Sequence, residues 1–146
     1  MPGPDLFDKL EEIERKLRRV DIVGGGGGTI QYVYQTFAFS YEGDVTEGSY
    51  GVRFYVRGTY TIDKVRLSLN TAPDTQSCIA DVHKNGVTIF TTQGNRPTVV
   101  AGSSYDDGTP DITALADGDY LEAYIDQGDG LGPVVHVYVK QQAWSI

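Results

Sequence analysis

The residues that could do chemistry in this chain of 146 residues are mostly carboxylates and tyrosines. Aspartates gather in three stretches that also contain glycine, at residues 106–111, 117–119 and 126–129. Loops of oxygen ligands can hold calcium. However, no stretch has the twelve-residue spacing of an EF-hand, and aspartate beside glycine is also common in ordinary turns. We therefore expect no cofactor and no metal, with calcium in these loops left open as the weaker alternative.

Ten tyrosines are many for this length, and they cannot all lie in a core. Tyrosine joins an apolar ring to a polar tip, which suits interfaces and saccharide surfaces. We expect Tyr32 and Tyr34 at a subunit interface. A saccharide-contacting surface is expected on the polar loops, together with residues 43–49, at Tyr105, Asp106, Asp107 and Asp129. The alternative is that these are ordinary solvated loops.

No motif of an enzyme accompanies these residues. His83 and His136 each lie in a strand-like run, and the chain contains no HExxH, CxxC or GxSxG. Each histidine is expected on a strand at a surface or an interface. The single cysteine, Cys78, excludes an intramolecular disulfide and is expected to be a small buried residue. We expect no enzymatic activity.

The element that would position these residues is an N-terminal helix over residues 5–21. Its apolar positions step by four and three residues, which is the heptad pattern of a coiled coil. These positions are Leu6, Leu10, Ile13, Leu17 and Val20. Leucine at a with isoleucine at d disfavours dimers. The pattern predicts a short parallel coiled coil of three or four chains. The alternative is one amphipathic helix lying on its own domain.

Charges beside this seam support the coiled coil. Lys9 and Lys16 fall at g positions, and Glu14 and Asp21 fall at the e positions that they would face on a neighbouring chain. Both pairs have opposite charge. The helix is marginal alone in water at this length. We therefore expect the following domain to associate as well, and its flanks alone to hold the oligomer weakly.

The chain divides by composition into three parts. Residues 1–23 form the expected coiled-coil helix, residues 24–28 are five consecutive glycines that act as a flexible linker, and residues 29–146 form one domain. The net charge is −8, and no basic stripe occurs in the domain. This argues against nucleic-acid partners. No apolar run approaches the length needed for membrane insertion.

The domain reads as strand and turn throughout. Asn85-Gly86 between two strand-like runs predicts a two-residue hairpin of type I′. Residues 102–110 are expected to be a polar loop. Strands are expected at residues 29–41, 50–62, 64–70, 79–84, 87–92, 98–101, 120–125 and 134–140. About eight short antiparallel strands predict a mainly β fold, namely a jelly-roll-like β-sandwich.

The order of motifs from Lys64 to Val139 resembles a β-sandwich domain of tailed bacteriophages, found in tail-fibre tips and minor tail proteins. The resemblance covers about half of the chain. It is carried by KVRLSLNTAP (64–73), DVHKNGVTIFTT (81–92), NRPTVVAG (95–102), TPDITALADGDYL (109–121) and VVHVYVK (134–140). It implies a β-sandwich on a virion appendage, commonly trimeric, and this is why we choose three chains over four. The motif implies no ligand residues.

These observations together predict a structural virion protein, made in the host cytoplasm. We expect a homotrimeric tail-tip or fibre-type appendage that contacts other virion proteins through its N-terminal helix. A host-surface saccharide is a further possible partner. One alternative is a trimeric capsid decoration protein, since the chain has almost no shaft. A bacterial carbohydrate-binding module is disfavoured, since no secretion signal or catalytic domain accompanies the expected sandwich.

Overall fold

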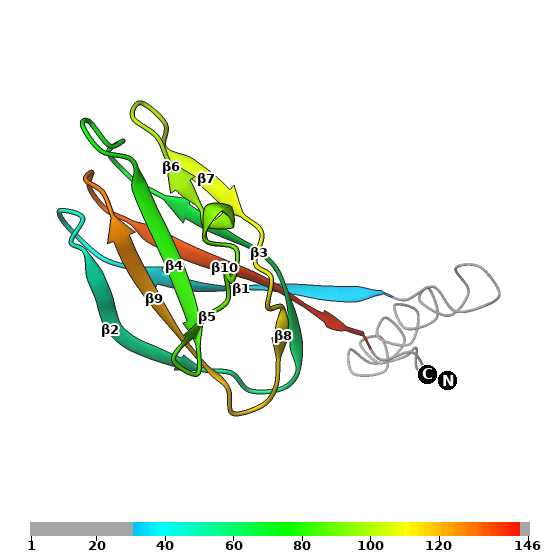
Figure 1. The fold of residues 1–146 in the computed structure, drawn as a ribbon. Coiled ribbons are helices and arrows are strands. Elements are labelled where there is room, and N and C mark those ends of the chain that lie inside the picture. Colours follow the sequence, from blue (N-terminus) through cyan, green and yellow to red (C-terminus); the bar gives the residue numbers. More distant parts are fainter. Residues whose placement is uncertain (1–30, 144–146) are drawn as a thin grey trace, which may run out of the picture. The chain divides into compact units, whose positions relative to one another are not determined.

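The computed structural model describes residues 31–143 (Figure 1). The predicted coiled-coil helix, the glycine linker and the last three residues lie outside the described residues. The chain divides into two units, Tyr34–Gln141 and a smaller one formed by Met1–Val33 with Gln142–Ile146. In the described part of the smaller unit, the Ala143 N–H donates to the Gln31 carbonyl oxygen at 2.9 Å.

The described strands form two antiparallel sheets, which except for the outermost residues of β1 and β10 belong to the larger unit. The first sheet has the order β1-β10-β3-β7, with β8 also pairing β3. Its strands are β1 (Tyr32–Ser40), β3 (Tyr60–Ser68), β7 (Tyr105–Gly108), β8 (Ala114–Leu115) and β10 (Val134–Gln142). The second sheet has the order β2-β9-β4-β5, with β6 also pairing β4. Its strands are β2 (Gly48–Tyr55), β4 (Cys78–Lys84), β5 (Val87–Thr88), β6 (Thr98–Val99) and β9 (Tyr120–Gln127).

Consecutive long strands alternate between the sheets, because β1 and β3 belong to the first sheet and β2 and β4 to the second. This alternation is compatible with a jelly roll. Within these sheets, the order of the described strands places β1 and β2 at the edges. The described helical structure is limited to a 3₁₀ turn at Gln93–Asn95, and no described helix could span a membrane. The predicted mainly β, sandwich-like fold is confirmed.

Strand alternation supplies the core between the sheets. In β3, Val65 and Leu67 point inward and are fully buried, while their neighbours Lys64 and Arg66 are partly exposed. The same period of two recurs along the other long central strands. Further buried residues are Ala80 and Val82 of β4, Leu121, Ala123 and Ile125 of β9, and Val135, Val137 and Val139 of β10. Cys78 is also fully buried, as predicted, and burial raises the pKa of its thiol to about 11.

The predicted hairpin is present at Asn85-Gly86. The two residues have φ values of 52° and 85°, so both occupy the left-handed region that a type I′ turn requires. Asn85 also fixes the neighbouring turn, since its side-chain amide donates to Asp119 Oδ1 at 2.9 Å and its Oδ1 accepts the Tyr120 N–H. The dipeptide therefore sets both the hairpin and its contact with the start of β9.

Parts of the strand prediction are wrong, including the strand expected over residues 87–92, which ends at Thr88. The single strand expected over residues 50–62 is divided into β2 and β3 by a turn at Gly58, which has a φ of 95°. The Gly58 N–H donates to Asp117 Oδ1 at 2.7 Å, which fixes this crossing between the sheets. The polar loop expected over residues 102–110 contains β7, which pairs β3. Its polar side chains are accommodated because they find partners on the sheet surface.

Candidate functional site

The four residues predicted to contact a ligand do not lie in one cluster of contacts. Tyr105 and Asp107 lie on the outer face of the first sheet, beside Arg66. Asp106, between them on β7, accepts the Thr98 N–H through Oδ2 at 2.8 Å. Asp129, in the loop before β10, holds a different loop. Its carboxylate accepts the Asp74 N–H at 2.9 Å and the Thr75 hydroxyl at 2.6 Å.

Arg66 is the centre of the cluster that contains Tyr105 and Asp107. Its Nε lies 2.6 Å from Asp107 Oδ1 and its Nη2 lies 3.0 Å from Oδ2, which is a two-point ion pair. Lys64 Nζ reaches the same carboxylate at 3.2 Å. The hydrogen bond from Arg66 is the main reason why the pKa of Asp107 is lowered below its usual value of 3.8. At neutral pH this carboxylate is therefore ionised, and it binds both Arg66 and Lys64.

Aromatic rings flank the same guanidinium group. Arg66 lies 4.6 Å from the centre of the Tyr105 ring and 5.5 Å from that of Tyr138. The strand register brings the three together, since Tyr105 of β7 pairs with Ser68 and Tyr138 of β10 pairs with Lys64, each two residues from Arg66 on β3. We name Lys64, Arg66, Tyr105, Asp107 and Tyr138 the Arg66 cluster. Within this cluster the two basic side chains bind Asp107, and the guanidinium of Arg66 lies against both tyrosine rings.

His136 lies beside this cluster and contacts a hydroxyl group and an aromatic ring. Its Nε2 is 3.0 Å from the Ser68 hydroxyl oxygen, and its ring is nearly parallel to that of Tyr138, with centroids 5.9 Å apart. Burial, followed by the positive charge of Arg66, lowers the pKa of His136 below 6.5. The structure thus places this histidine on a strand surface, as predicted, in contact with a hydroxyl group.

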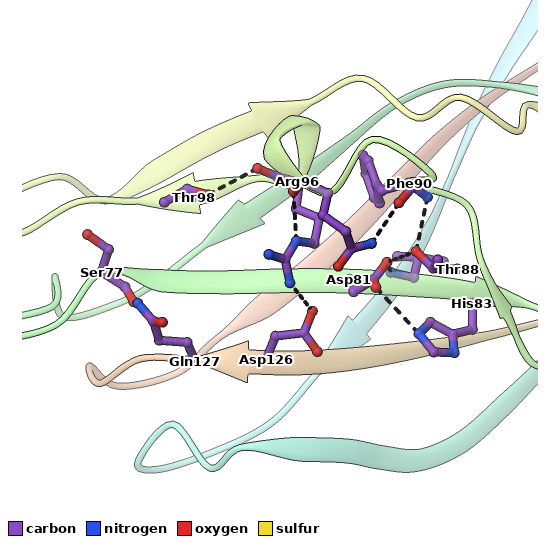
Figure 2. Close-up of polar contacts among 11 residues, drawn as sticks. Ser77, Asp81, His83, Thr88, Phe90, Arg96, Thr98, Asp126 and Gln127 are labelled. Carbon is purple, nitrogen blue, oxygen red and sulfur yellow. Dashed lines mark hydrogen bonds and ion pairs between the residues drawn. The ribbon is translucent and has the colours of Figure 1, made fainter.

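A buried aspartate on β4 is a feature that the sequence did not reveal (Figure 2). Asp81 is 3% exposed. Its Oδ1 accepts the Val82 N–H and the Thr88 hydroxyl, each at 2.7 Å, and its Oδ2 lies 3.4 Å from His83 Nε2. An acid, a histidine and a hydroxyl suggest a nucleophilic triad, but that chemistry requires the hydroxyl to face the histidine. Here Thr88 donates to the acid instead.

The segment that buries Asp81 is fixed on the second sheet by further polar contacts. The Phe90 N–H donates to the Thr88 hydroxyl oxygen at 3.0 Å, and Arg96 Nη1 lies 2.6 Å from Asp126 Oδ2 of β9 (Figure 2). Gln93 Nε2 donates to the Phe90 carbonyl oxygen at 2.6 Å. The network therefore holds the crossing from β5 to β6 in place. Its sequence signal is weak, because an aspartate at an outward strand position ordinarily indicates solvent.

Asp81 is a polar side chain that is buried, whereas apolar side chains are exposed where β1 and β2 border the two sheets. We name Phe37, Tyr41, Tyr50, Val52 and Phe54 the β1–β2 edge. Phe37 stacks on Phe54 with ring centroids 4.5 Å apart, and Tyr41 stacks on Tyr50 at 5.9 Å. Despite these contacts, Val52 is 58% exposed and Phe54 39%. Among the described residues, seven of the eleven exposed large apolar side chains lie on β1, on β2 or in their connection.

Two hollows adjoin this edge. A groove of about 250 Å³ is lined by residues 38–41 together with Tyr50 and Val52. A wider hollow of about 600 Å³ is formed by residues 40–43, Asn70, Thr71 and the loop before β10. Its loops are joined by backbone contacts, including the Val45 N–H to the Gly130 carbonyl oxygen at 2.9 Å. In the part of the chain that the structure describes, no group of three or more potential ligands is placed to hold a metal.

Comparison with known proteins gives no family for this chain. No protein-family model matches it, and no curated protein matches it. The catalytic unit of a thermostable GH87 alpha-1,3-glucanase from Streptomyces thermodiastaticus strain HF3-3 is similar in structure to this chain, with a TM-score of 0.42 and 17% sequence identity. That likeness covers 73% of this chain but only a quarter of the glucanase chain.

A chain in the cyanophage Pam1 capsid asymmetric unit has a TM-score of 0.43 and 16% identity, covering 82% of this chain and 89% of that one. Both TM-scores are below 0.5, so neither likeness assigns a family or a function.

Proposed function

We propose that this chain is a structural protein of a tailed-bacteriophage virion, assembled as a homotrimeric tail-tip or fibre-type appendage. The observation that carries this proposal is the contrast between the polar and apolar groups of the sandwich. The carboxylates expected to bind a ligand are engaged within the fold, by Thr98, Arg66 and Thr75. The apolar side chains Val52 and Phe54, by contrast, remain exposed in the described chain, which favours assembly over catalysis.

The sequence supports the phage assignment and the number of chains. The order of motifs from Lys64 to Val139 resembles phage tail-fibre and minor tail domains. The heptad seam from Leu6 to Val20, with its complementary charges at e and g, favours three or four parallel helices. In the proposed particle, the helix docks on other virion proteins and the sandwich faces outward.

A host-surface saccharide is the proposed ligand of the outward sandwich. Tyr105 is the best-placed of the predicted ligand residues, because the residue is 55% exposed although Arg66 lies over one face of its ring. The free face of such a ring can stack on a sugar. A glycan array tests this: Tyr105→Ala should abolish the binding of a single class of saccharide. Binding that is unchanged in this variant would place the ligand elsewhere.

The position on the virion is tested by labelling particles with an antibody against the sandwich. We expect label at the tail tip of the phage that encodes the chain, seen by electron microscopy. Label distributed over the head would identify the decoration alternative instead. Particles without any label would contradict a virion role.

The trimer is tested by Ile13→Asp in the full chain. A charge buried in the heptad seam should dissociate the helices, so the mass measured by light scattering should fall from three chains toward one. Lys9→Glu with Glu14→Lys is a matched control, because it exchanges the paired charges and keeps the apolar seam. An Ile13→Asp chain with unchanged mass and thermal stability would contradict the coiled coil.

A further inference from the structure

We infer that the β1–β2 edge is the surface on which a second copy of this chain packs. This inference rests on the homotrimer proposed above and names the part of the sandwich that completes it. The occupant is another sandwich of the same sequence, and the contact is made chiefly by side chains.

The exposure of the side chains of β2 is the first observation that supports this inference. None of its eight residues is buried, and only Tyr50 is partly so. Yet Phe54 pairs with the buried Leu121 of β9 and its ring stacks on Phe37 of β1. Val52 lines the groove together with Tyr50, whose ring stacks on Tyr41 just after β1. Val52 and Phe54 therefore lie at the border between the two sheets and remain exposed there. Exposed apolar residues gathered in one place mark interaction sites more often than scattered ones do.

The character of the two strands is the second support. Proteins ordinarily protect long edge strands with charges, prolines or bulges. The nine residues of β1, YVYQTFAFS, contain neither a charged residue nor a proline. In β2, the register shifts between Ser49 and Arg53, and Gly51 has a φ of 71°. This irregularity disfavours extension of the β2 ladder by another strand. On the β2 side, the contact that remains is made by side chains that enter the groove of about 250 Å³ beside Val52.

The N-terminal sequence indicates which molecule occupies the edge. The chain enters β1 directly after the heptad segment and the five glycines, so an oligomer of the helices keeps other copies of the sandwich within a short linker. A short flexible linker gives an effective concentration in the millimolar range. Even a weak apolar contact is then populated. Under three-fold symmetry the edge meets a different surface of its neighbour, whereas a two-fold dimer would pair edge with edge.

The first experiment compares two valines in the full chain carrying Ile13→Asp. Val52 of β2 is 58% exposed, and Val87 of β5, on the opposite border of the second sheet, is 59% exposed. Val52→Glu should weaken the residual self-association at least tenfold in sedimentation, whereas Val87→Glu should leave it unchanged. Equal effects of the two substitutions would overturn the inference. Melting temperatures of both variants check that each sandwich is folded.

A second experiment uses the full chain with its heptad seam intact, so it does not depend on weak association. A nitroxide label is attached to Val52→Cys or to Val87→Cys, while the fully buried Cys78 stays unlabelled. Label at position 52 should lose mobility and accessibility to a soluble relaxation agent when the full chain is compared with the Ile13→Asp chain, and label at position 87 should not. A trimer in which label at position 52 stays as mobile and accessible as in the Ile13→Asp chain overturns the edge contact. A full chain that is monomeric before labelling overturns the proposed trimer instead.

Discussion

The Arg66 cluster and the β1–β2 edge are both rich in aromatic residues, yet they are satisfied in different ways. In the cluster, Arg66 lies against the rings of Tyr105 and Tyr138, and Asp107 binds its guanidinium at 2.6 Å. At the edge, rings contact other rings, and Val52 and Phe54 remain exposed. The number of surface tyrosines is thus a poor guide to function. What distinguishes the two regions is that the charged groups of the cluster are paired within the chain, whereas Val52 and Phe54 keep apolar surface exposed.

The cause of this difference is the position of the strands in their sheets. Arg66 lies on β3, which has β10 on one side and β7 on the other, so cross-strand partners are available on both sides. Among the described strands, β1 and β2 each have a neighbour on one side only. Phe37 and Phe39 of β1 are still buried against the core, whereas Val52 and Phe54 of β2 remain exposed.

The largest effect is expected from Phe37→Ala, which tests how far the edge also belongs to the core. Phe37 is 8% exposed and contacts both Phe54 and Tyr60, with centroids at 4.5 and 5.6 Å. Truncating such a ring should lower the free energy of unfolding by about 3 kcal/mol. Denaturant titration measures this. Tyr55→Ala, at a site 60% exposed, is the control and should cost much less; equal costs would mean that Phe37 is not a core residue.

A smaller effect is expected from Asp107→Asn in the Arg66 cluster. It removes a largely solvent-screened ion pair, so the loss at neutral pH should be at most about 1 kcal/mol. The pKa of Asp107 is lowered in the folded chain. Its stabilisation is therefore fully present above the unfolded value near 3.8, and it is lost as pH falls through the folded pKa.

Urea titrations at several pH values should accordingly show a shallower loss of stability in acid for Asp107→Asn than for the unmodified chain. Asp63→Asn is the control, because Asp63 is more exposed and lies 3.8 Å from its lysine partner. If Asp107→Asn and Asp63→Asn have the same acid dependence, the Arg66 ion pair does not contribute as described.

The smallest effect is expected from Tyr50→Phe. The Tyr50 hydroxyl oxygen is the buried side-chain polar atom without a hydrogen-bond partner in the described part of the chain, and burial raises the pKa of this group. An unpaired buried hydroxyl is costly. Its removal should therefore leave the melting temperature unchanged or slightly higher. A clear loss of stability would show that this hydroxyl has a partner, and a second subunit would be the first place to search.

Local sequence patterns predicted the parts of the fold that short-range geometry decides. Asn85-Gly86 predicted a hairpin because both residues need positive φ, and the alternation around Val65 and Leu67 predicted which face is buried. The pattern could not show that Tyr105 and Asp107 lie on a strand. Their place in β7 depends on Arg66, which is about forty residues away in the chain.

The candidate site was harder to predict for the same reason. Asp81 has the sequence pattern of an exposed strand residue, and it is buried because Thr88 and the following segment fold over it. Val52 and Phe54 have the pattern of core residues, and they are exposed because β2 borders its sheet. Alternation gives the side of the strand on which a residue lies. Whether anything covers that side depends on tertiary contacts.

The most direct test of the central claim is the solution mass of the full chain, measured by light scattering over a series of concentrations. An assembly protein with a heptad seam and an apolar sandwich edge should have three times the chain mass of 16.0 kDa at every concentration. A full chain that remains monomeric at the highest concentration would contradict both the coiled coil and the assignment of the edge to self-association.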